Sequence, residues 1–342
     1  MAPPSARTGG APPLGRVPVL LTALGVLVLA ALASLALGSK GIGLPAVLQG
    51  LLHGSGDPDA VIVRQLRVPR TFIGIATGAA LGLAGAVMQS VTRNPIADPG
   101  ILGVSQGAAS GVVIAVSVFS VTSYTAYVWW GFLGALCAAA VVYGLAGRGR
   151  DSATPVKLAL AGSAIGAFIG ALNNAVLTTN AATYDQFRFW QIGSLGTATE
   201  RTAWQLLPFV AVGCALVLPL ARSLDVLALG DEAAAALGTR VRLVRAVAVL
   251  GATVLTGASV AATGPVAFVG LLAPHAARAL VGVRHLWLLP LSALCGAALL
   301  LSTDTVGRIL FPPSEVPAGV MTAVAGVPLL IWLVRARKGV PV

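Results

Sequence analysis

Long stretches without a charged residue constrain this chain more than any other feature. The longest covers 49 residues, from Pro99 to Gly147. A hydrocarbon core about 30 Å thick is crossed by roughly 20 apolar residues in a helix. With 57% hydrophobic and 10% charged residues, the chain has too little polar surface to enclose a soluble core of this size. The sequence therefore predicts an integral membrane protein.

The charge-free stretches divide into ten predicted membrane spans, so the expected fold is an all-α polytopic membrane protein. The 49-residue run must fold back near residues 120–124, because a single helix of that length would overshoot the bilayer. The run at 246–277 is broken at Gly264 and Pro265, and it also holds two crossings. The expected spans are 17–39, 71–92, 99–120, 125–147, 158–180, 202–221, 243–262, 265–283, 286–304 and 316–334.

Positive charge orients the predicted bundle. An amino terminus in the cytoplasm leaves 15 of the 22 Lys and Arg residues inside and 7 outside, and cytoplasmic loops normally carry the excess. Ten crossings return the chain to the same side, so both termini are predicted to be cytoplasmic. Residues 1–16 are expected to be a disordered tail and 337–342 a short tail, with one transmembrane domain at 17–336. The span at 17–39 is too long for a signal peptide and is expected to be retained.

Composition excludes several classes of function. The net charge of +11 sits in short segments between apolar runs, which favours membrane orientation over nucleic-acid binding. Cys137, Cys214 and Cys295 lack a metal-binding spacing and the three histidines are scattered, so we expect no metal site. No Ser, His and Asp arrangement is recognisable, and we expect no catalytic residues.

The acidic residues bear on the source of energy. All 11 fall in predicted loops or at span ends, whereas proton- or sodium-coupled carriers usually need an ionisable site within the membrane. The sequence also has no GxxxxGK[ST] phosphate-binding loop. Any ATP that drives this chain is therefore expected to be hydrolysed by a separate subunit.

Small and polar residues in the second span predict close helix packing. Gly74, Gly78, Gly82 and Gly85 recur at three- and four-residue spacing, which lets helix backbones approach closely. Gln89 is expected to hydrogen-bond across helices. The turn-rich segment 93–100 that follows is expected to form a rigid elbow.

A short helix is predicted in the cytoplasmic loop LALGDEAAAALG at 227–238. Asp231 and Glu232 would lie at its positive amino-terminal end, and Gly238 would stop it. Two helical turns are only marginally stable alone, so another contact should hold this helix. A helix that lies on the lipid surface without a partner is the alternative.

Four blocks of sequence resemble a known family. They are RVPRTFIGIATGAALGLAGAVMQSVTRNPIADPGILGVSQGAASG from Arg67, LALGDEAAAALG, GPVAFVGLLAPHAAR at 264–278, and STDTVGRILFPPSEVPAGVMTAVAGVPLLIWLV near the end. Together they extend over residues 60–335. In these blocks the chain closely resembles the FecCD family, the permease subunits of bacterial importers for iron-siderophores, haem and cobalamin.

The resemblance implies two docking surfaces. On the outside, Arg67, Arg70 and Arg308 match arginines that form salt bridges with glutamates of a substrate-binding protein, although helix-end anchoring is the alternative. On the inside, the 227–238 loop matches the coupling helix that docks on the ATPase. Its residues are Leu229, Gly230, Asp231, Glu232, Ala235, Leu237 and Gly238.

The resemblance also suggests where the transport pathway lies. In this family the fifth and tenth spans line a path between two permease copies. The resemblance therefore implicates the predicted fifth and tenth spans of this chain, 158–180 and 316–334. At the cytoplasmic gate, where the cobalamin member has two small hydroxyl residues, this chain has Pro155 and Val156, which puts the gate in doubt. The candidates for the pathway or gate are Gln89, Asn94, Pro95, Asn173, Asn174, Pro155 and Val156.

The resemblance therefore predicts the permease subunit of an ATP-binding cassette importer in the bacterial inner membrane, most often for a ferric siderophore. It implies a homodimer, or a heterodimer with a paralogue, two ATPase subunits, and an extracytoplasmic binding protein. This chain would bind no cofactor, since ATP and Mg are used by the ATPase. The alternatives are a cobalamin or haem permease, and an ATP-independent carrier or channel.

Overall fold

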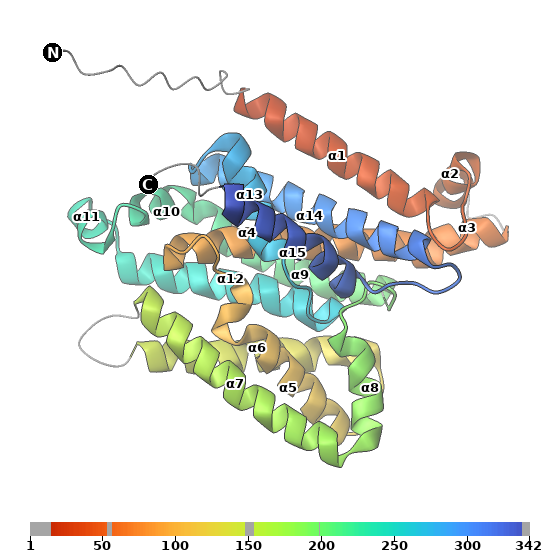
Figure 1. The fold of residues 1–342 in the computed structure, drawn as a ribbon, viewed down its shortest axis with the longest axis horizontal. Helices are drawn as coiled ribbons and strands as arrows, with labels where there is room; N and C mark the ends of the chain where they lie inside the picture. Colours follow the sequence, from red (N-terminus) through yellow and green to blue (C-terminus); the bar gives the residue numbers. More distant parts are fainter. Residues whose placement is uncertain (1–14, 53–56, 148–153, 198, 337–342) are drawn as a thin grey trace.

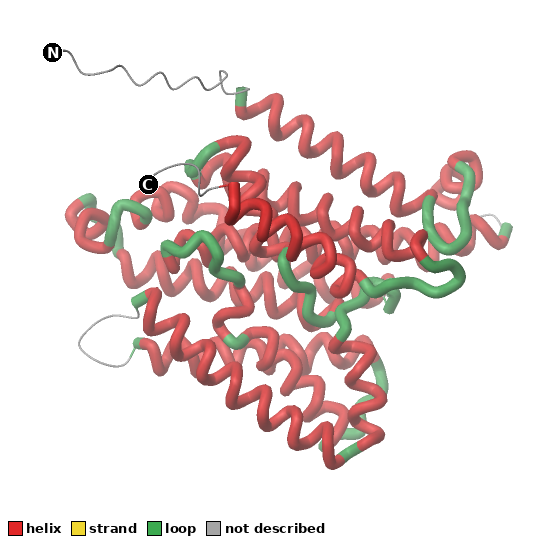
Figure 2. The backbone as a smooth tube through the Cα atoms, viewed as in Figure 1, coloured by secondary structure: helices red, strands yellow, loops and turns green. Residues whose placement is uncertain are grey.

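The computed structural model describes residues 15–52, 57–147, 154–197 and 199–336. The predicted tails at 1–16 and 337–342 lie outside this part of the chain, apart from Gly15 and Arg16. In the described ranges every regular element is a helix, in agreement with the predicted all-α fold (Figure 2). The elements are α1 (Arg16–Ala36), α2 (Leu44–Leu52), α3 (Pro58–Ile62), a π-helical turn (Val63–Arg67), α4 (Val68–Thr92), a 3-10 turn (Pro99–Leu102), α5 (Val104–Ser117), α6 (Tyr124–Ala146), α7 (Pro155–Thr179), α8 (Ala181–Gln191), α9 (Glu200–Val217), a 3-10 turn (Leu218–Leu220), α10 (Ala221–Leu227), α11 (Asp231–Ala236), α12 (Val241–Thr263), α13 (Val269–Val281), α14 (His285–Leu310) and α15 (Ala318–Ala336).

Ten of these helical segments are apolar, and they fall on the ten predicted spans. Seven are long enough to cross a membrane, and the segments in α5, α13 and α15 are shorter. The seven contain α1, α4, α6, α7, α9, α12 and α14. The prediction of a polytopic membrane protein is therefore confirmed.

The third span differs from the prediction because it is not one continuous helix, and the eighth begins later than predicted, after the expected break at Gly264 and Pro265. Residues 99–120 form a 3-10 turn followed by α5, and residues 264–268 precede the short α13 without regular structure. Non-helical backbone at membrane depth is tolerated only where protein covers it. Both helices are largely buried, and Ser194 N–H donates to the carbonyl of Thr263 at 2.8 Å beside this break. Hydropathy could not reveal the turn before α5, because that segment remains apolar.

Helix α4 lies at the centre of the bundle and packs against α12, α13 and α14 (Figure 1). Glycines allow these approaches: a Cβ on Gly82 would lie 2.2 Å from the carbonyl oxygen of Ser292, and a Cβ on Gly85 only 1.8 Å from that of Gly270. Both distances are far below van der Waals contact. The predicted close packing along the glycine row is confirmed.

The two ends of the bundle carry different elements. Figure 1 shows the start of α1, the end of α15 and the short helix α11 on its left side, and α2, α3 and α8 on its right side. This placement agrees with an even number of crossings. We name the left side the inner end and the right side the outer end, following the predicted orientation. The short helices α2, α3 and α8 were not predicted.

Candidate functional site

At the outer end, the structure brings Arg70 of α4 and Asp304 of α14 into contact. Nε and Nη2 of Arg70 donate to the two carboxylate oxygens of Asp304 at 3.0 and 2.8 Å, and Nη1 donates to Glu315 at 2.7 Å. Asp304 is fully buried, whereas the side chain of Glu315 is 35% exposed. This two-point Arg–carboxylate geometry is among the strongest hydrogen-bonded ion pairs.

Arg308 and Arg67 lie beside Arg70, Asp304 and Glu315 and complete a cluster of charged residues at the outer end. Nε of Arg308 lies 3.2 Å from Asp304, an ion pair without hydrogen-bond geometry. Its Nη1 and Nη2 donate to the carbonyl and hydroxyl oxygens of Ser34 at 3.1 and 2.9 Å. Arg67 donates to the carbonyl oxygens of Leu35 at 2.7 Å and of Lys40. The three predicted docking arginines thus form one group around α4, α14 and the end of α1.

Burial changes how these arginines can act. Arg67 and Arg308 are almost completely buried, and in this structure their hydrogen bonds are made within the chain. They line an outer cavity of about 330 Å³ whose other members include Lys40, Arg70 and Glu315. The docking role of the arginines stays a prediction, and it requires that a partner reach into this cavity rather than rest on an exposed patch.

The position of Asp304 corrects one expectation. We expected every acidic residue in a loop or at a span end, with the ninth span ending at 304. Instead α14 continues to Leu310, so Asp304 lies within the helix. The prediction was wrong because a lone charge terminates a hydrophobic stretch in a sequence, whereas here two arginines compensate the buried carboxylate.

At the inner end, the predicted short helix is present as α11, and its role as a coupling helix stays a prediction. Gly230 precedes it with φ of +111°, and Gly238 follows it with φ of +81°, conformations that favour glycine. The N–H groups of Gly238 and Thr239 donate to the carbonyls of Ala235 and Ala234 and close the helix. Leu229 and Leu237 on either side are each 65% exposed. Glu232 and Ala235 are exposed as well. The loop presents an apolar surface suited to another protein.

Asp231 anchors α11 to the bundle, which sequence reasoning missed. Both of its carboxylate oxygens accept from Nη2 of Arg245 in α12 at 2.9 Å, and Arg93, just after α4, also donates to it. Partial burial disfavours the charged carboxylate, but the hydrogen bonds and charges of Arg245 and Arg93 outweigh it and lower the pKa of Asp231. The contact that the short helix required is therefore this double ion pair.

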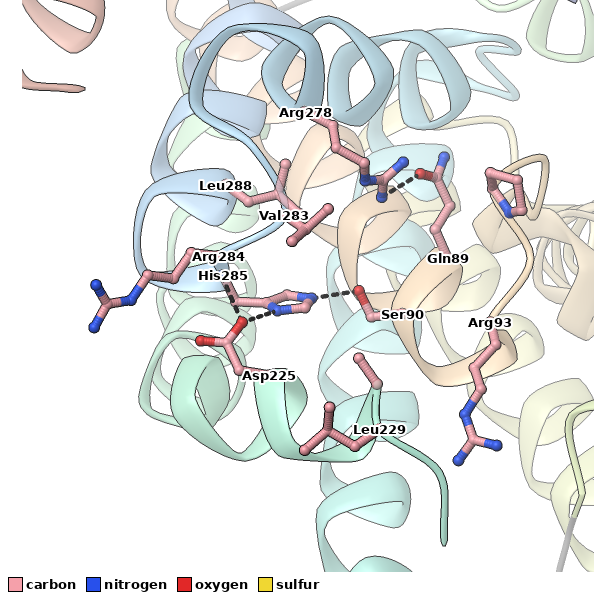
Figure 3. A pocket seen from close by; sticks show the side chains of 12 residues that line it. Gln89, Ser90, Arg93, Asp225, Leu229, Arg278, Val283, Arg284, His285 and Leu288 are labelled. Atoms are coloured by element: carbon pink, nitrogen blue, oxygen red, sulfur yellow. Dashed lines mark hydrogen bonds and ion pairs between the residues drawn. The ribbon is translucent and has the colours of Figure 1, made fainter. Parts of the chain in front are cut away.

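A cavity of about 600 Å³ lies beside α11 at the inner end. Figure 3 shows Gln89 and Arg278 meeting across it, and Arg278 donates to Gln89 at 3.0 Å. The amide nitrogen of Gln89 lies 3.3 Å from the carbonyl oxygen of Leu271. Gln89 therefore links α4 to α13, which confirms its predicted hydrogen bonding across helices. Leu229 lines the same cavity, so the cavity borders the 227–238 loop.

The same cavity contains a Ser–His–Asp arrangement that the sequence did not reveal. Nδ1 of His285 lies 2.6 Å from Asp225, and Nε2 lies within hydrogen-bond distance of the Ser90 hydroxyl (Figure 3). The Ser90 oxygen also lies 2.8 Å from the carbonyl of Ala86. The Ser90 hydroxyl donates its proton to this carbonyl of its own helix. The arrangement joins α4, α10 and α14 as a structural link.

Two adjacent pathway candidates behave differently. Asn173 is buried, accepts from Ser110 at 2.7 Å and donates to the carbonyl of Gln106 at 3.4 Å, so it holds α7 against α5. The next residue, Asn174, is exposed. The pathway role of both residues stays a prediction, and the exposed side chain of Asn174 is the one of the two that is open to a second permease.

The remaining candidates lie at the inner end. Asn94 and Pro95 are exposed in the turn after α4, where Asn94 Oδ1 accepts from Ile96 N–H at 3.1 Å and stiffens the expected elbow. Pro155 is the first residue of α7, Val156 is exposed, and the hydroxyl of Thr154 caps the helix. Within the described residues, no group of three or more His, Cys, Asp or Glu is placed to hold a metal ion.

Comparison with known proteins identifies relatives along almost the whole chain. The FecCD transport family matches residues 26–336. The chain is 41% identical over 312 residues to the ferric enterobactin transport system permease protein FepD of Escherichia coli, covering 91% of this chain and 93% of that one. It is 39% identical to the hemin transport system permease protein HmuU of Yersinia pestis, covering 89% and 92%.

The fold agrees with these sequence similarities. A solved metal-chelate type ABC transporter in an inward-facing conformation matches the structure with a TM-score of 0.84 at 28% identity, over 94% of this chain and 99% of that one. The family match and the relatives cover well over half of the chain and include both ends described above. This chain therefore belongs to the FecCD transport family.

Proposed function

We propose that this chain is the permease subunit of an ATP-binding cassette importer that carries a ferric siderophore into the cytoplasm. The observation that carries this proposal is the 41% identity with a ferric enterobactin permease over nearly the full length of both chains. The fold, close to that of a metal-chelate ABC transporter, supports the same conclusion.

The assembly that we propose contains two permeases, two ATPase subunits and a binding protein. The exposed leucines at both ends of α11 supply an apolar surface for an ATPase, and Asp231 connects that surface to α12 and to the end of α4. ATP and Mg would be used by the ATPase, and this chain would bind no cofactor. The second permease is a second copy of this chain or a paralogue.

In this assembly the chain would transmit movement rather than perform chemistry. A force on α11 reaches Arg245 and Arg93 through the carboxylate of Asp231. Arg93 directly follows α4, the helix around which α12, α13 and α14 pack. ATP-driven closure of the ATPases would thereby shift the central helix and alternate access to the path. We place this assembly in the bacterial inner membrane.

Transport into proteoliposomes tests the proposal. The chain would be reconstituted with its ATPase and binding-protein partners, and uptake of radioactive iron as ferric enterobactin would be followed with and without ATP. We expect uptake only in the presence of ATP, the ATPase and the binding protein. Uptake that persisted without the ATPase would contradict the importer and favour an ATP-independent carrier.

The cargo is tested by competition in the same vesicles. Hemin and cobalamin are the alternatives, because relatives named for their transport are 39% and 38% identical to this chain. We expect excess unlabelled ferric siderophore to abolish uptake of labelled iron and excess hemin or cobalamin to leave it unchanged. Uptake of labelled hemin or cobalamin instead of iron would replace the siderophore in the proposal and retain the importer.

A further inference from the structure

The guanidinium of Arg70 is held by two carboxylates that differ in burial. Asp304 takes Nε and Nη2 and is fully buried, so it is inaccessible from the outer surface. Glu315 takes Nη1 at 2.7 Å and is about one-third exposed. Nε and Nη2 of Arg70 are thus occupied by a buried carboxylate, whereas Nη1 is occupied by the partly exposed carboxylate of Glu315.

The surroundings of Glu315 favour negative charge. The outer cavity is lined by the cationic side chains of Lys40, Arg67, Arg70 and Arg308, and Glu315 is the acidic residue among its lining residues. Asp59 pairs with Lys40 at its edge. The volume of about 330 Å³ equals about ten water molecules at roughly 30 Å³ each, enough for a carboxylate side chain. The cavity therefore suits a carboxylate, and Glu315 supplies one from within.

We propose that Glu315 is an internal substitute for a partner's carboxylate, and that an acidic side chain of the docking protein displaces it from Nη1 of Arg70. This inference rests on the proposed function, which supplies the partner. One carboxylate replaces another on the same nitrogen, so the exchange leaves the buried charge balanced by Asp304. Competition of this kind keeps docking weak and reversible while retaining specificity for acidic partners.

Displacement of Glu315 would also reach α15. Glu315 lies in the segment 311–317 between α14 and α15, the loop that Figure 2 shows between the two helices. The next residue, Val316, donates its N–H to the carbonyl of Gly307 at 3.0 Å. The carbonyl of Pro317 accepts from the N–H groups of Val320 and Met321 and starts α15. Movement of Glu315 would therefore shift the first residues of α15, which begins three residues later at Ala318.

Binding of a labelled hexaglutamate peptide tests the inference without any other subunit. The full chain in neutral-lipid nanodiscs would be titrated at low salt, and peptide binding followed by fluorescence anisotropy. The test variant is Glu315→Gln. The control is Glu200→Gln, which removes the same charge from the exposed start of α9. We expect Glu315→Gln to bind the peptide about tenfold more tightly than wild type, and the control to stay within about twofold.

Equal affinities for the two variants, or no peptide binding by Glu315→Gln, would overturn the inference. If Glu315→Gln does not fold, Glu315→Asp serves instead, because it keeps the charge and shortens the reach to Arg70. We expect it to bind about threefold more tightly than wild type, and unchanged binding would equally contradict the proposal. The peptide assay involves neither ATP nor a transported ligand, so its failure is distinct from failure of the transport assay.

Discussion

Arg245 of α12 holds Asp231, the first residue of α11, through both carboxylate oxygens at 2.9 Å. Arg245 is 1% exposed and Asp231 lies at the surface, so the pair joins the bundle interior to the short helix α11 at the inner end. A six-residue helix does not persist without such a tertiary contact. The position of α11 is therefore set by this contact and by Arg93.

Replacing Asp231 should uncouple ATP hydrolysis from transport. In Asp231→Asn the two arginines lose their charged acceptor, and hydrogen bonds to charged groups contribute about 1.5–3 kcal/mol each. We expect uptake per ATP hydrolysed to fall about tenfold while ATPase activity persists. Asp185→Asn is the control, since Asp185 is an exposed carboxylate of α8 at the outer end, remote from α11. Uptake and hydrolysis can be measured in the same proteoliposomes. Equal coupling in both variants would show that the anchor does not transmit movement.

The lowered pKa of Asp231 predicts the pH range over which α11 stays docked. A carboxyl group whose pKa is lower in the folded state stabilises it above the unfolded value of about 3.9, and this stabilisation is lost as the pH falls through the folded value. A spin label at Leu237→Cys should therefore keep constant mobility from neutral pH to about pH 4 and gain mobility only below it. The acidic transition should disappear in Asp231→Asn. Loosening between pH 5 and 7 in the wild type would contradict the assignment.

Removing Asp304 should destabilise the protein strongly. Asp304→Ala leaves Arg70 and Arg308 near each other without the buried carboxylate, and breaking a buried ion pair costs about 3–5 kcal/mol. We expect a lower unfolding temperature in detergent and less monodisperse protein on size-exclusion chromatography. Asp185→Ala is the control, because Asp185 is 63% exposed and its pair with Arg188 at 3.4 Å is at the surface. Similar stability of the two variants would refute the structural importance of Asp304.

The glycine contacts of α4 should tolerate no side chain. A methyl group at Gly82 would lie 2.2 Å from the carbonyl oxygen of Ser292 in α14, so the two helices would have to separate. We expect Gly82→Ala to lower the unfolding free energy by about 1–3 kcal/mol, the usual range for overpacking. Gly25→Ala in α1 is the control, because a Cβ there meets nothing within 4 Å, and it should be neutral or slightly stabilising. Thermal unfolding of both variants in one detergent gives the comparison.

The ten apolar segments could be predicted because a helix that crosses the bilayer must hydrogen-bond its backbone internally and must present apolar side chains to the lipid. Burying the backbone in lipid requires a helix, and a helix of apolar residues is visible as a charge-free stretch. Gly230, Asp231 and Gly238 likewise marked α11 through rules that act within a few residues. The break at Gly264 and Pro265 before α13 was visible as a glycine–proline pair. The 3-10 turn before α5 escaped prediction, since protein rather than lipid covers it and its composition does not change.

The arginines illustrate the same division. Their family positions could be read from the motif around Arg67 and Arg70, but a motif says nothing of whether a guanidinium faces solvent. Burial of Arg67 and Arg308 depends on the end of α1, which supplies Ser34 and Leu35 as acceptors. The link from Asp225 through His285 to Ser90 was invisible for a similar reason, because its members come from three distant helices.

The sequence by itself determined that the chain crosses a membrane, which side its cations favour, and which family it resembles, since hydropathy, charge and motifs are local properties. Only the tertiary structure decided which charges meet. It paired Asp304 with Arg70 and Arg308, set Glu315 on the remaining nitrogen of Arg70, and tied Asp231 to Arg245. The physical reason is that a buried charge is stable only beside its partner, and the partner is chosen by how the helices pack and not by its distance along the chain.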